Sequence, residues 1–319
     1  MILSDNKLLS FATCNNNFSP ENFIRYIIIS PAKDEAQHIE LTLKSVTEQT
    51  LKPILWVIVD DASKDNTSDI ISRYFNSYPF IRLVKHSHDS IRKTGSAVIR
   101  AFNYGYAAVG NIDYDFIVKL DCDLSFDADY FEKLLKQFLM DQSIGIASGV
   151  YLESDKHGLF TIVSMPSYHA AGACKVIRRR CFEEIGGFIE SAGWDTVDEI
   201  RAMTRGWKTC HFRDLRMLHH RAEGTGIGVL RTSAMHGKIY YLTGGGCSFF
   251  LLKTIHRLLV KPYLLNSIAL LCGYLISLFR KEPLLVNDKE ARFYRYMLNK
   301  RLFGNLRELV KHLHFSPFR

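Results

Sequence analysis

The sequence lacks the cysteine spacing that builds structural zinc sites or disulfide frameworks. Its seven cysteines are scattered, odd in number, and never form a Cys-x-x-Cys pair. This distribution favours a reduced, cytoplasmic compartment. The chain also shows no basic segment followed by an apolar one at its start, so residues 1–24 are expected to form a loose polar arm rather than a targeting leader.

Two glycine-rich signatures of nucleotide-binding proteins are also missing. No Gly-x-Gly-x-x-Gly follows the first apolar segment, which disfavours a dehydrogenase, and no glycine-rich phosphate loop ending in Gly-Lys-Ser/Thr occurs. No pattern typical of DNA- or RNA-binding modules accompanies the net charge of +8, so we expect no nucleic-acid partner. The positive charge instead favours an anionic membrane surface or a phosphate-bearing substrate.

What is present is the composition of a folded protein, with 47% hydrophobic and 23% charged residues over 319 positions. This length predicts one large domain, or one domain with an appendage. In the first half, short apolar segments alternate with segments whose apolar residues recur at helical spacing. Strands are expected at Tyr26–Ser30, Ile54–Val59, Ile81–Val84 and Phe116–Leu120, and helices at Glu35–Gln49, Asp65–Tyr74, Gly95–Ala108 and Ala128–Leu139. The alternation predicts an open α/β sheet.

Acidic residues directly follow three of these strands. They are Asp34 and Glu35, then Asp60 and Asp61, then Asp121 and Asp123. Ligands of open α/β sheets bind outside the carboxyl ends of the strands, so these carboxylates are expected at one rim. Crowded carboxylates repel one another unless a cation or hydrogen-bond donors compensate. Helix capping explains one such cluster, but three clusters favour a metal-dependent enzyme that acts on phosphate compounds.

Four segments, in order along the chain, resemble the motifs of glycosyltransferase family 2, whose members are inverting enzymes with the GT-A fold. Pro31–Glu35 resembles the family's P-x-x-[ND]-E motif, and Val59–Thr67 resembles V-D-D-x-S-x-D-x-T. Gly95–Gly105 resembles the G-x-A…N-x-G helix, and Asp121–Asp123 stands in the place of the DxD metal motif. The resemblance implies a GT-A domain over residues 25–235, with a mixed, mostly parallel sheet flanked by helices.

The resemblance also implies a nucleotide-sugar donor, most often a UDP-sugar in this family, and a divalent cation, Mn²⁺ or Mg²⁺. Such a cation acts as a Lewis acid on the leaving diphosphate. Asp123 is the expected metal ligand, His219 completes the metal or diphosphate site, and Arg221 is a candidate for holding phosphate. The implied donor-binding residues are Pro31, Ala32, Lys33, Glu35, Asp61, Arg92, Asp121 and Cys122. For Lys33 and Arg92, the alternative of a solvated surface cation stays open.

The second half is expected to supply the acceptor side and the catalytic base. The segment with Gly172 and Ala173 resembles the family's acceptor-side G-A-x-x-x-x-R-R motif. Direct displacement at an anomeric carbon needs a base that takes the acceptor proton on the face opposite the leaving group, so inversion follows.

The choice of base follows from the family's Glu-Asp pair, which precedes an Arg at fixed spacing. Anchoring that pattern on Arg201 puts Asp195 on the catalytic aspartate and Trp194, on the acceptor side, where Glu is expected. This departure leaves Asp198 and Glu199 as alternative bases. A solvated first turn of a helix is the competing interpretation of these two acids.

From residue 236 the composition changes, and residues 236–319 are expected to form a helical, membrane-associated region. Cys247–Val260 has amphipathic character, and Tyr263–Phe279 is almost entirely apolar but at the lower limit of length for a transmembrane helix. The tail from Arg280 is basic. Basic flanks and a cytosolic donor favour helices that lie in the inner leaflet, at the cytoplasmic face of the membrane. A buried helix of a soluble core or a dimer interface is the alternative.

Together these observations predict an inverting, metal-dependent glycosyltransferase that acts on a saccharide or lipid-linked acceptor in polysaccharide or glycoconjugate synthesis. A polyprenyl-phosphate sugar transferase shares the early motifs but needs little base assistance, since its acceptor is a lipid phosphate. Trp194 in place of the usual acid raises a third hypothesis, a membrane-docked nucleotide-binding subunit without catalytic activity.

Overall fold

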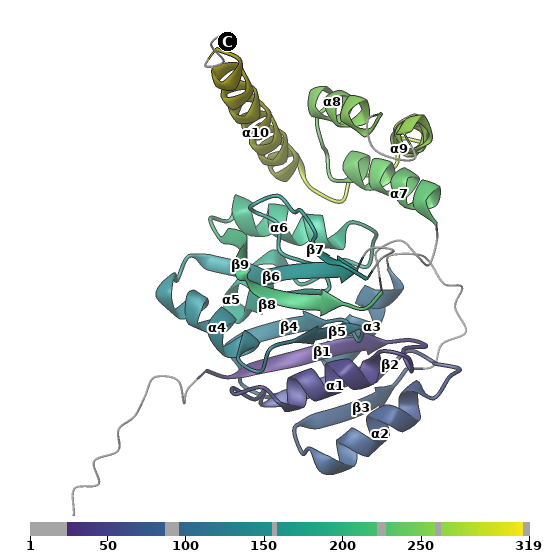
Figure 1. The fold of residues 1–319 in the computed structure, drawn as a ribbon, viewed down its shortest axis with the longest axis vertical. Helices are drawn as coiled ribbons and strands as arrows, with labels where there is room; N and C mark the ends of the chain where they lie inside the picture. The colour runs from purple at the N-terminus through teal and green to yellow at the C-terminus, as the bar shows by residue number, and fades with distance from the viewer. Residues whose placement is uncertain (1–23, 87–95, 155–157, 222–227, 259–262, 315–319) are drawn as a thin grey trace, which may run out of the picture.

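The computed structural model describes residues 24–86, 96–154, 158–221, 228–258 and 263–314. The strands in these ranges form one curled sheet, whose first half is parallel (Figure 1). That half has the order β3-β2-β1-β4 and consists of β1 (Tyr26–Ala32), β2 (Leu55–Asp60), β3 (Ile81–Lys85) and β4 (Phe116–Leu120). Each of these strands overlaps a segment expected from the sequence.

The second half of the sheet is mixed. After β4 the order continues β8-β6-β9-β5, and the strands are β5 (Leu124–Phe126), β6 (Ile144–Ser154), β7 (Phe160–Ile162), β8 (Cys174–Arg178) and β9 (Lys208–His219). β8 runs antiparallel to both of its neighbours, while β9 is parallel to β6. The expected mixed, mostly parallel sheet is confirmed.

Helices cover both faces of the sheet (Figure 1). One face carries α1 (Ile39–Thr47), α2 (Thr67–Ser77) and α4 (Tyr130–Met140), and the other carries α3 (Ala97–Ala107) and α5 (Arg179–Ile185). Alternate residues of one strand therefore enter different cores. In β1, Ile28 packs toward α1, whereas Ile27 and Ile29 pack toward α3. Burial on both faces explains why β1 and β2 are nearly continuous apolar runs.

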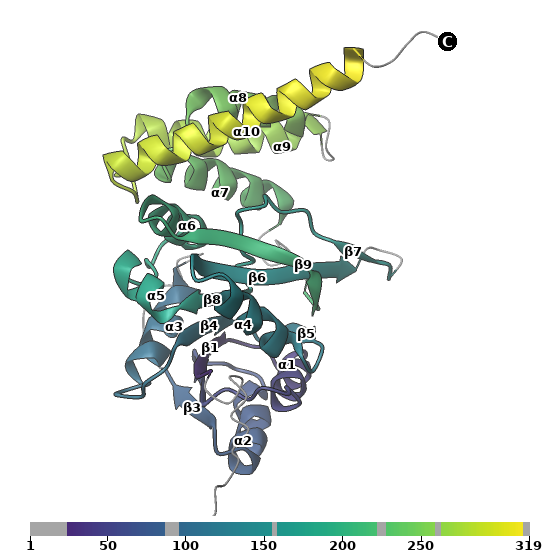
Figure 2. The same ribbon diagram turned by 90° about the vertical axis from the view of Figure 1, so that its left-hand side faces the viewer.

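Five helices lie beyond the mixed half of the sheet (Figures 1 and 2). They are α6 (Trp194–Thr204), α7 (Val229–Leu242), α8 (Cys247–Arg257), α9 (Tyr263–Phe279) and α10 (Asp288–His314). A third core joins α6 to the others, with Val197 and Ile200 packed among Tyr240, Phe250 and Tyr294. The predicted domain boundary between residues 235 and 236 falls inside α7.

Helices α7 and α9 touch backbone to backbone. A Cβ added at Gly237 would lie 1.9 Å from the Leu270 carbonyl oxygen, and one at Gly273 would lie 1.9 Å from that of Ala234. Only glycine permits this approach at either position. Such small-residue contacts are typical of helix pairs in membranes.

Helix α9 is inside out, because its polar side chains are buried and most of its large apolar side chains are exposed. Asn266 is 3% exposed and Ser277 is 1% exposed, whereas Leu264 is 59% and Phe279 is 79% exposed. The Ser233 hydroxyl on α7 donates to Asn266 Oδ1 at 2.8 Å, which satisfies part of this polar face. Among the described residues, no helix is both long and apolar enough to cross a bilayer.

Candidate active site

The loops after β1 and β2 are tied together by the residues of their own motifs. The Asp34 N–H donates to Ser63 Oγ at 3.0 Å, and the Lys64 N–H donates back to Asp34 Oδ1 at 2.7 Å. The Glu35 N–H donates to Thr67 Oγ1 at 2.8 Å. Asp34 has a φ of 54°, in the left-handed region. These bonds delay the start of α1 to Ile39, four residues after the expected start.

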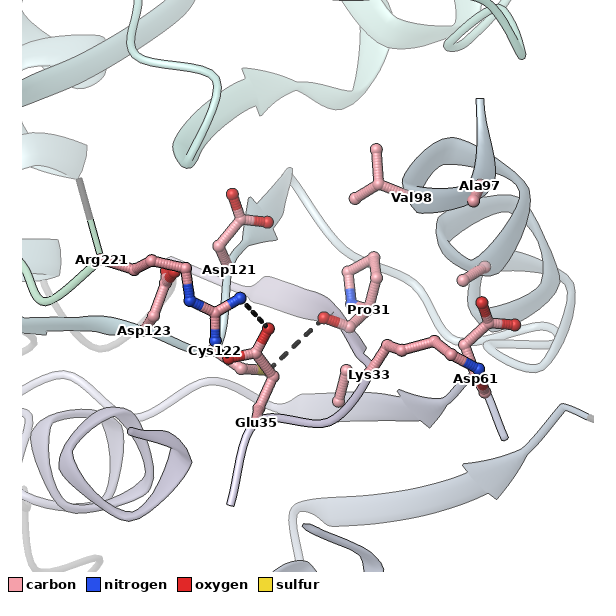
Figure 3. A pocket seen from close by; sticks show the side chains of 12 residues that line it. Pro31, Lys33, Glu35, Asp61, Ala97, Val98, Asp121, Cys122, Asp123 and Arg221 are labelled. Atoms are coloured by element: carbon pink, nitrogen blue, oxygen red, sulfur yellow. Dashed lines mark hydrogen bonds and ion pairs between the residues drawn. The ribbon is translucent and has the colours of Figure 1, made fainter. Parts of the chain in front are cut away.

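A cavity of about 270 Å³ lies at this rim of the sheet, and we call it the first cavity (Figure 3). It receives residues from strand ends and loops that are far apart in sequence. Its lining residues are Pro31, Ala32, Lys33, Glu35, Asp61, Ala97, Val98, Ala101, Asp121, Cys122, Asp123 and Arg221. Every expected donor-binding residue is among them except Arg92, which lies outside the described residues. The acidic clusters after β1, β2 and β4 therefore meet, as the topology of a parallel sheet predicts.

Asp61 lies at one end of the first cavity (Figure 3). His86, at the end of β3, places Nδ1 3.0 Å from Asp61 Oδ1, and its ring stacks on Tyr104 at 4.2 Å between centroids. Lys33 Nζ donates to the backbone carbonyls of Asp61 and Ala62. His86 was not expected from the sequence, although its place directly after a strand is the signal that the acidic clusters share.

Asp121 and Asp123 lie at the other end (Figure 3). The ammonium of Lys119, buried in β4, lies 2.5 Å from Asp121 Oδ1. Burial raises the pKa of Asp121, and Lys119 opposes that shift. Burial would also raise the pKa of Asp123, but His219 and Arg221 hold it below its usual value. Asp123 is therefore the more readily ionised member of the pair.

These residues fit a divalent cation. Asp123 Oδ1 is buried and has no hydrogen-bond partner in the described part of the chain. His219 Nε2 lies 3.6 Å from Asp123 Oδ2, while its Nδ1 is held 3.0 Å from Glu153 Oε1. A carboxylate that fixes the far nitrogen of a histidine is the usual support of a metal ligand.

The described residues contain no group of three or more His, Cys, Asp and Glu side chains placed to hold a metal. A cation bound by Asp123 and His219 would therefore take its other ligands from phosphate oxygens and water, as hard divalent cations commonly do.

Arg221 closes the first cavity by pairing with Glu35. Two guanidinium nitrogens lie 3.1 and 2.5 Å from the two carboxylate oxygens, across 186 residues of sequence. Burial raises the pKa of Glu35 to about 7, with Asp123 adding to the shift and Arg221 opposing it. The Glu35 carboxyl group thus holds the arginine at the end of the cavity where Asp121 and Asp123 lie.

The expected acceptor-side residues lie next to Asp121. The Asp121 N–H donates to the Ala173 carbonyl at 2.8 Å, and Lys119 Nζ donates to the Gly172 carbonyl at 2.9 Å. A Cβ at Gly172 would lie 3.5 Å from Asp195 Oδ2. The backbone at Gly172 and Ala173 therefore lies between Asp121 and Asp195.

Asp195 does not line the first cavity. It lines a second cavity, of about 430 Å³, between α6 and the helices α7, α8 and α10. Trp194, the preceding residue, lies under two ammonium groups, with Lys119 5.3 Å and Lys175 5.2 Å from its ring centroid. Trp194 therefore interacts with cations through its aromatic face. That the family carries a carboxylate at this position stays an expectation of the sequence.

Asp198 and Glu199 are buried in an ion network, although Glu199 also lines the second cavity. Lys175, which is fully buried in β8, lies 2.9 Å from Asp198 Oδ2 and 3.3 Å from Glu199 Oε1. Glu199 also accepts the Ala170 N–H at 2.8 Å and lies 3.0 Å from His169 Nδ1. The solvated first turn considered for these acids is wrong, because each is at most 2% exposed.

The same lysine holds the candidate base in place. Lys175 Nζ donates to the backbone carbonyl of Asp195 at 2.9 Å. The two alternative bases are thus committed to anchoring α6, while the Asp195 carboxylate faces the second cavity. Lys175 was missed from the sequence because a lysine within a strand gives no local sign that it is buried.

Comparisons with known proteins agree with this geometry. The family model described as Glycosyl transferase family 2 matches residues 27–192. A chondroitin synthase and a hyaluronan synthase, both from Pasteurella multocida, are each 28% identical over 117 residues. The aligned part is 37% of this chain but only 11% of either relative.

Solved structures extend the likeness to most of the chain. A mannosyltransferase from Pyrobaculum calidifontis, in complex with GDP-Man and Mn²⁺, superposes with a TM-score of 0.55 and 18% identity, over 82% of this chain and 89% of that one. GalNAc-T7 with UDP, GalNAc and Mn²⁺ gives a TM-score of 0.54 and 16% identity, over 76% of this chain and 52% of that one. At these identities the likeness establishes the GT-A fold.

Proposed function

The chain belongs to glycosyltransferase family 2, and we propose that it transfers a sugar from a nucleotide-sugar donor, a UDP-sugar, to a saccharide or glycolipid acceptor with inversion. The observation that carries the proposal is the first cavity, with Asp61 at one end and Asp121 and Asp123 at the other. This separation suits a nucleoside diphosphate, whose base donates N–H groups and whose phosphates need a cation.

Each end of the first cavity has a proposed task. Asp61, oriented by His86, accepts an N–H of the nucleotide base, with Pro31 and Ala32 forming the wall beside it. Asp121 contacts the ribose or a metal-bound water. Asp123 and His219 hold Mn²⁺ or Mg²⁺, which supplies Lewis-acid stabilisation of the leaving diphosphate.

Asp195 is the proposed catalytic base. The acceptor oxygen attacks the anomeric carbon as Asp195 takes its proton, and the bond from that carbon to the diphosphate breaks, with the electron pair leaving on the phosphate oxygen. Gly172 lies between Asp121 and Asp195. Asp195 can therefore act on the side of the sugar away from the phosphates. Attack from that side inverts the anomeric centre.

The experiment is a donor panel with Mn²⁺, using membranes as the acceptor source and three single variants. Asp195→Asn is expected to lower transfer by about 10²–10⁴-fold while UDP affinity is retained. Asp123→Asn is expected to lose both transfer and metal-dependent UDP binding. Asp141→Asn, at a surface ion pair with Lys208, is the matched control and is expected to stay active.

Two outcomes would contradict this assignment. Near-full transfer by folded Asp195→Asn would favour a polyprenyl-phosphate sugar transferase, whose acceptor needs little base assistance. Absence of any donor turnover by the wild type, with UDP still bound, would favour a non-catalytic nucleotide-binding subunit.

We further propose that the C-terminal helices place the enzyme on an anionic bilayer at the cytoplasmic face, where its donor is available. Residues 236–319 contain 14 Lys and Arg but 4 Asp and Glu, so this region accounts for the whole positive charge of the chain. The exposed apolar side chains of α9 continue onto α8, where Leu251 and Ile255 are also exposed. An inside-out helix beside basic residues suits a lipid surface better than water.

Vesicle sedimentation tests this placement. The full chain is expected to bind vesicles that contain phosphatidylglycerol more strongly than neutral ones. Replacing Leu264 and Phe279 with serine is expected to weaken binding by more than tenfold, whereas Met140→Ser, an equally exposed residue on α4, is expected to have no effect. A stable dimer that ignores vesicles would instead identify the α9 face as a protein interface.

A further inference from the structure

The second cavity has the position of an acceptor site. Residues of α6 line it on one side and residues of α7, α8 and α10 on the other. Asp195 and Thr196 line it from α6, and Tyr151, Met165 and Tyr168 line it from the sheet side. Tyr151 also contacts the ring of His219, with 5.5 Å between the ring centroids, and His219 Nε2 lies 3.6 Å from Oδ2 of Asp123, which lines the first cavity.

Two cations on α8 face this cavity without an acidic partner. Lys253 and Arg257, one helical turn apart, both line it. Neither makes an ion pair with any carboxylate of the described residues, and Lys253 Nζ lies 5.7 Å from the Tyr240 ring centroid instead. The one glutamate of the cavity wall, Glu199, is already committed to Lys175 and His169.

This arrangement of cations is energetically unfavourable for the protein when no ligand is bound. Burial lowers the pKa of Lys253 to about 8, and the charges of Arg257 and Arg301 add to the shift. The like charges of Lys253, Arg257 and Arg301 repel one another. A methionine at position 253 would avoid that repulsion, so the lysine is best explained by an anionic ligand that is absent from the free protein.

The opposite face of α8 is apolar. Leu251, Leu252 and Ile255 are 61%, 43% and 50% exposed. The same short helix therefore offers positive charge to the cavity and hydrocarbon to the outside. A ligand that matches both faces is an amphiphile with an anionic head.

We propose that the second cavity binds the acceptor, and that Lys253 and Arg257 hold the phosphate or diphosphate group of a lipid-linked saccharide while its hydroxyl faces Asp195. This rests on the proposed function, because it uses Asp195 as the base. Lys253 and Arg257 are then specificity-determining residues, and soluble saccharides without a phosphate are poor acceptors.

The test is binding of two probes, farnesyl diphosphate in detergent micelles and inorganic diphosphate, to the full chain in the presence of saturating UDP and Mn²⁺. The nucleotide blocks the first cavity, which otherwise attracts diphosphate itself. Wild-type protein is expected to bind both probes, and the lipid probe at least tenfold more tightly. Equal affinity for the two probes would show that the site recognises the phosphate groups without the lipid, and would overturn the lipid part of the proposal.

Variants locate the site. Lys253→Met is expected to weaken both probes at least tenfold, Lys253→Arg to retain them, and Lys133→Met, a surface lysine paired with Asp129, to leave them unchanged. The melting temperature of Lys253→Met is expected to equal or exceed that of the wild type, because an unpaired cation is removed. Unchanged probe binding in folded Lys253→Met would overturn the proposal.

The two proposals fail separately. If the assigned function is wrong, UDP with Mn²⁺ does not bind or Asp195→Asn keeps its activity, whatever Lys253 does. If only the acceptor assignment is wrong, donor binding and the Asp195 effect persist while the Lys253 variants bind the probes like the wild type.

Discussion

Replacing Lys175 with methionine is expected to destabilise the protein strongly. Lys175 has no exposed surface and is shared by two carboxylates, at 2.9 Å from Asp198 and 3.3 Å from Glu199. Removing one member of a buried ion network costs about 3–5 kcal/mol, because the remaining charges are left uncompensated. For a domain of this size that corresponds to a fall in melting temperature of roughly 6–20 °C.

The pH dependence of this loss has a definite sign. Burial raises the pKa of Asp198 to about 7, and Lys175 opposes the shift, so removing Lys175 raises it further. Between about pH 4 and 7 the folded wild type and the folded variant both hold a proton on Asp198 that the unfolded chain releases, but above about pH 7 only the variant still holds it. Relative to the wild type, the free energy of unfolding of the variant therefore decreases as the pH rises above about 7, by at most about 1.4 kcal/mol per pH unit for one proton.

Urea denaturation at pH 5 and pH 8, followed by circular dichroism, measures both effects. Lys208→Met removes a lysine from a surface ion pair with Asp141 at 3.1 Å and is expected to cost less than 1 kcal/mol at either pH. The reasoning is refuted if Lys175→Met loses no more than this control, or if its loss is larger at pH 5 than at pH 8.

Three further outcomes follow from the structure. Chelation of divalent cations with EDTA is expected to abolish transfer and weaken UDP binding without changing the melting temperature of the donor-free protein; a large thermal shift would mean that the metal is structural. His86→Ala is expected to raise the donor KM roughly tenfold with kcat retained, because Asp61 loses the side chain that orients it; an unchanged KM in steady-state assays would remove His86 from the donor site. Gly237→Val is expected to lower the melting temperature markedly, since its Cβ meets the Leu270 carbonyl oxygen at 1.9 Å; an unaltered temperature would contradict the packing of α7 on α9.

The parallel half of the fold was predictable because its strands are buried on both faces. Continuous apolar runs such as Phe116–Leu120 have few other interpretations, and β4 has those bounds. The meeting of Asp61 with Asp121 and Asp123 followed from topology alone, since parallel strands share one carboxyl edge. The roles of these residues stay predictions.

The antiparallel half gave weaker signals. β6 (Ile144–Ser154) contains two glycines and two serines among its apolar residues, and its burial depends on β8 and β9, which are distant in sequence. Lys119 and Lys175 are buried only because carboxylates from other segments meet them. Such tertiary pairings leave no trace in local periodicity.

The C-terminal helices illustrate the same limit. Composition correctly located α9, with the bounds Tyr263–Phe279, but not which of its faces would be buried. That face depends on Gly237 and Ser233 of α7, which contact the backbone and Asn266 of α9.

The two ammonium groups over Trp194 also have a spectroscopic consequence. The indole contacts the ammonium groups of Lys119, which pairs with Asp121, and of Lys175, which donates to the carbonyl of Asp195. Because the emission of an indole responds to nearby charge, ligands that enter the first or the second cavity should change its wavelength and intensity by different amounts. A protein that keeps Trp194 as its sole tryptophan would thus report the order in which donor and acceptor arrive, without any attached dye.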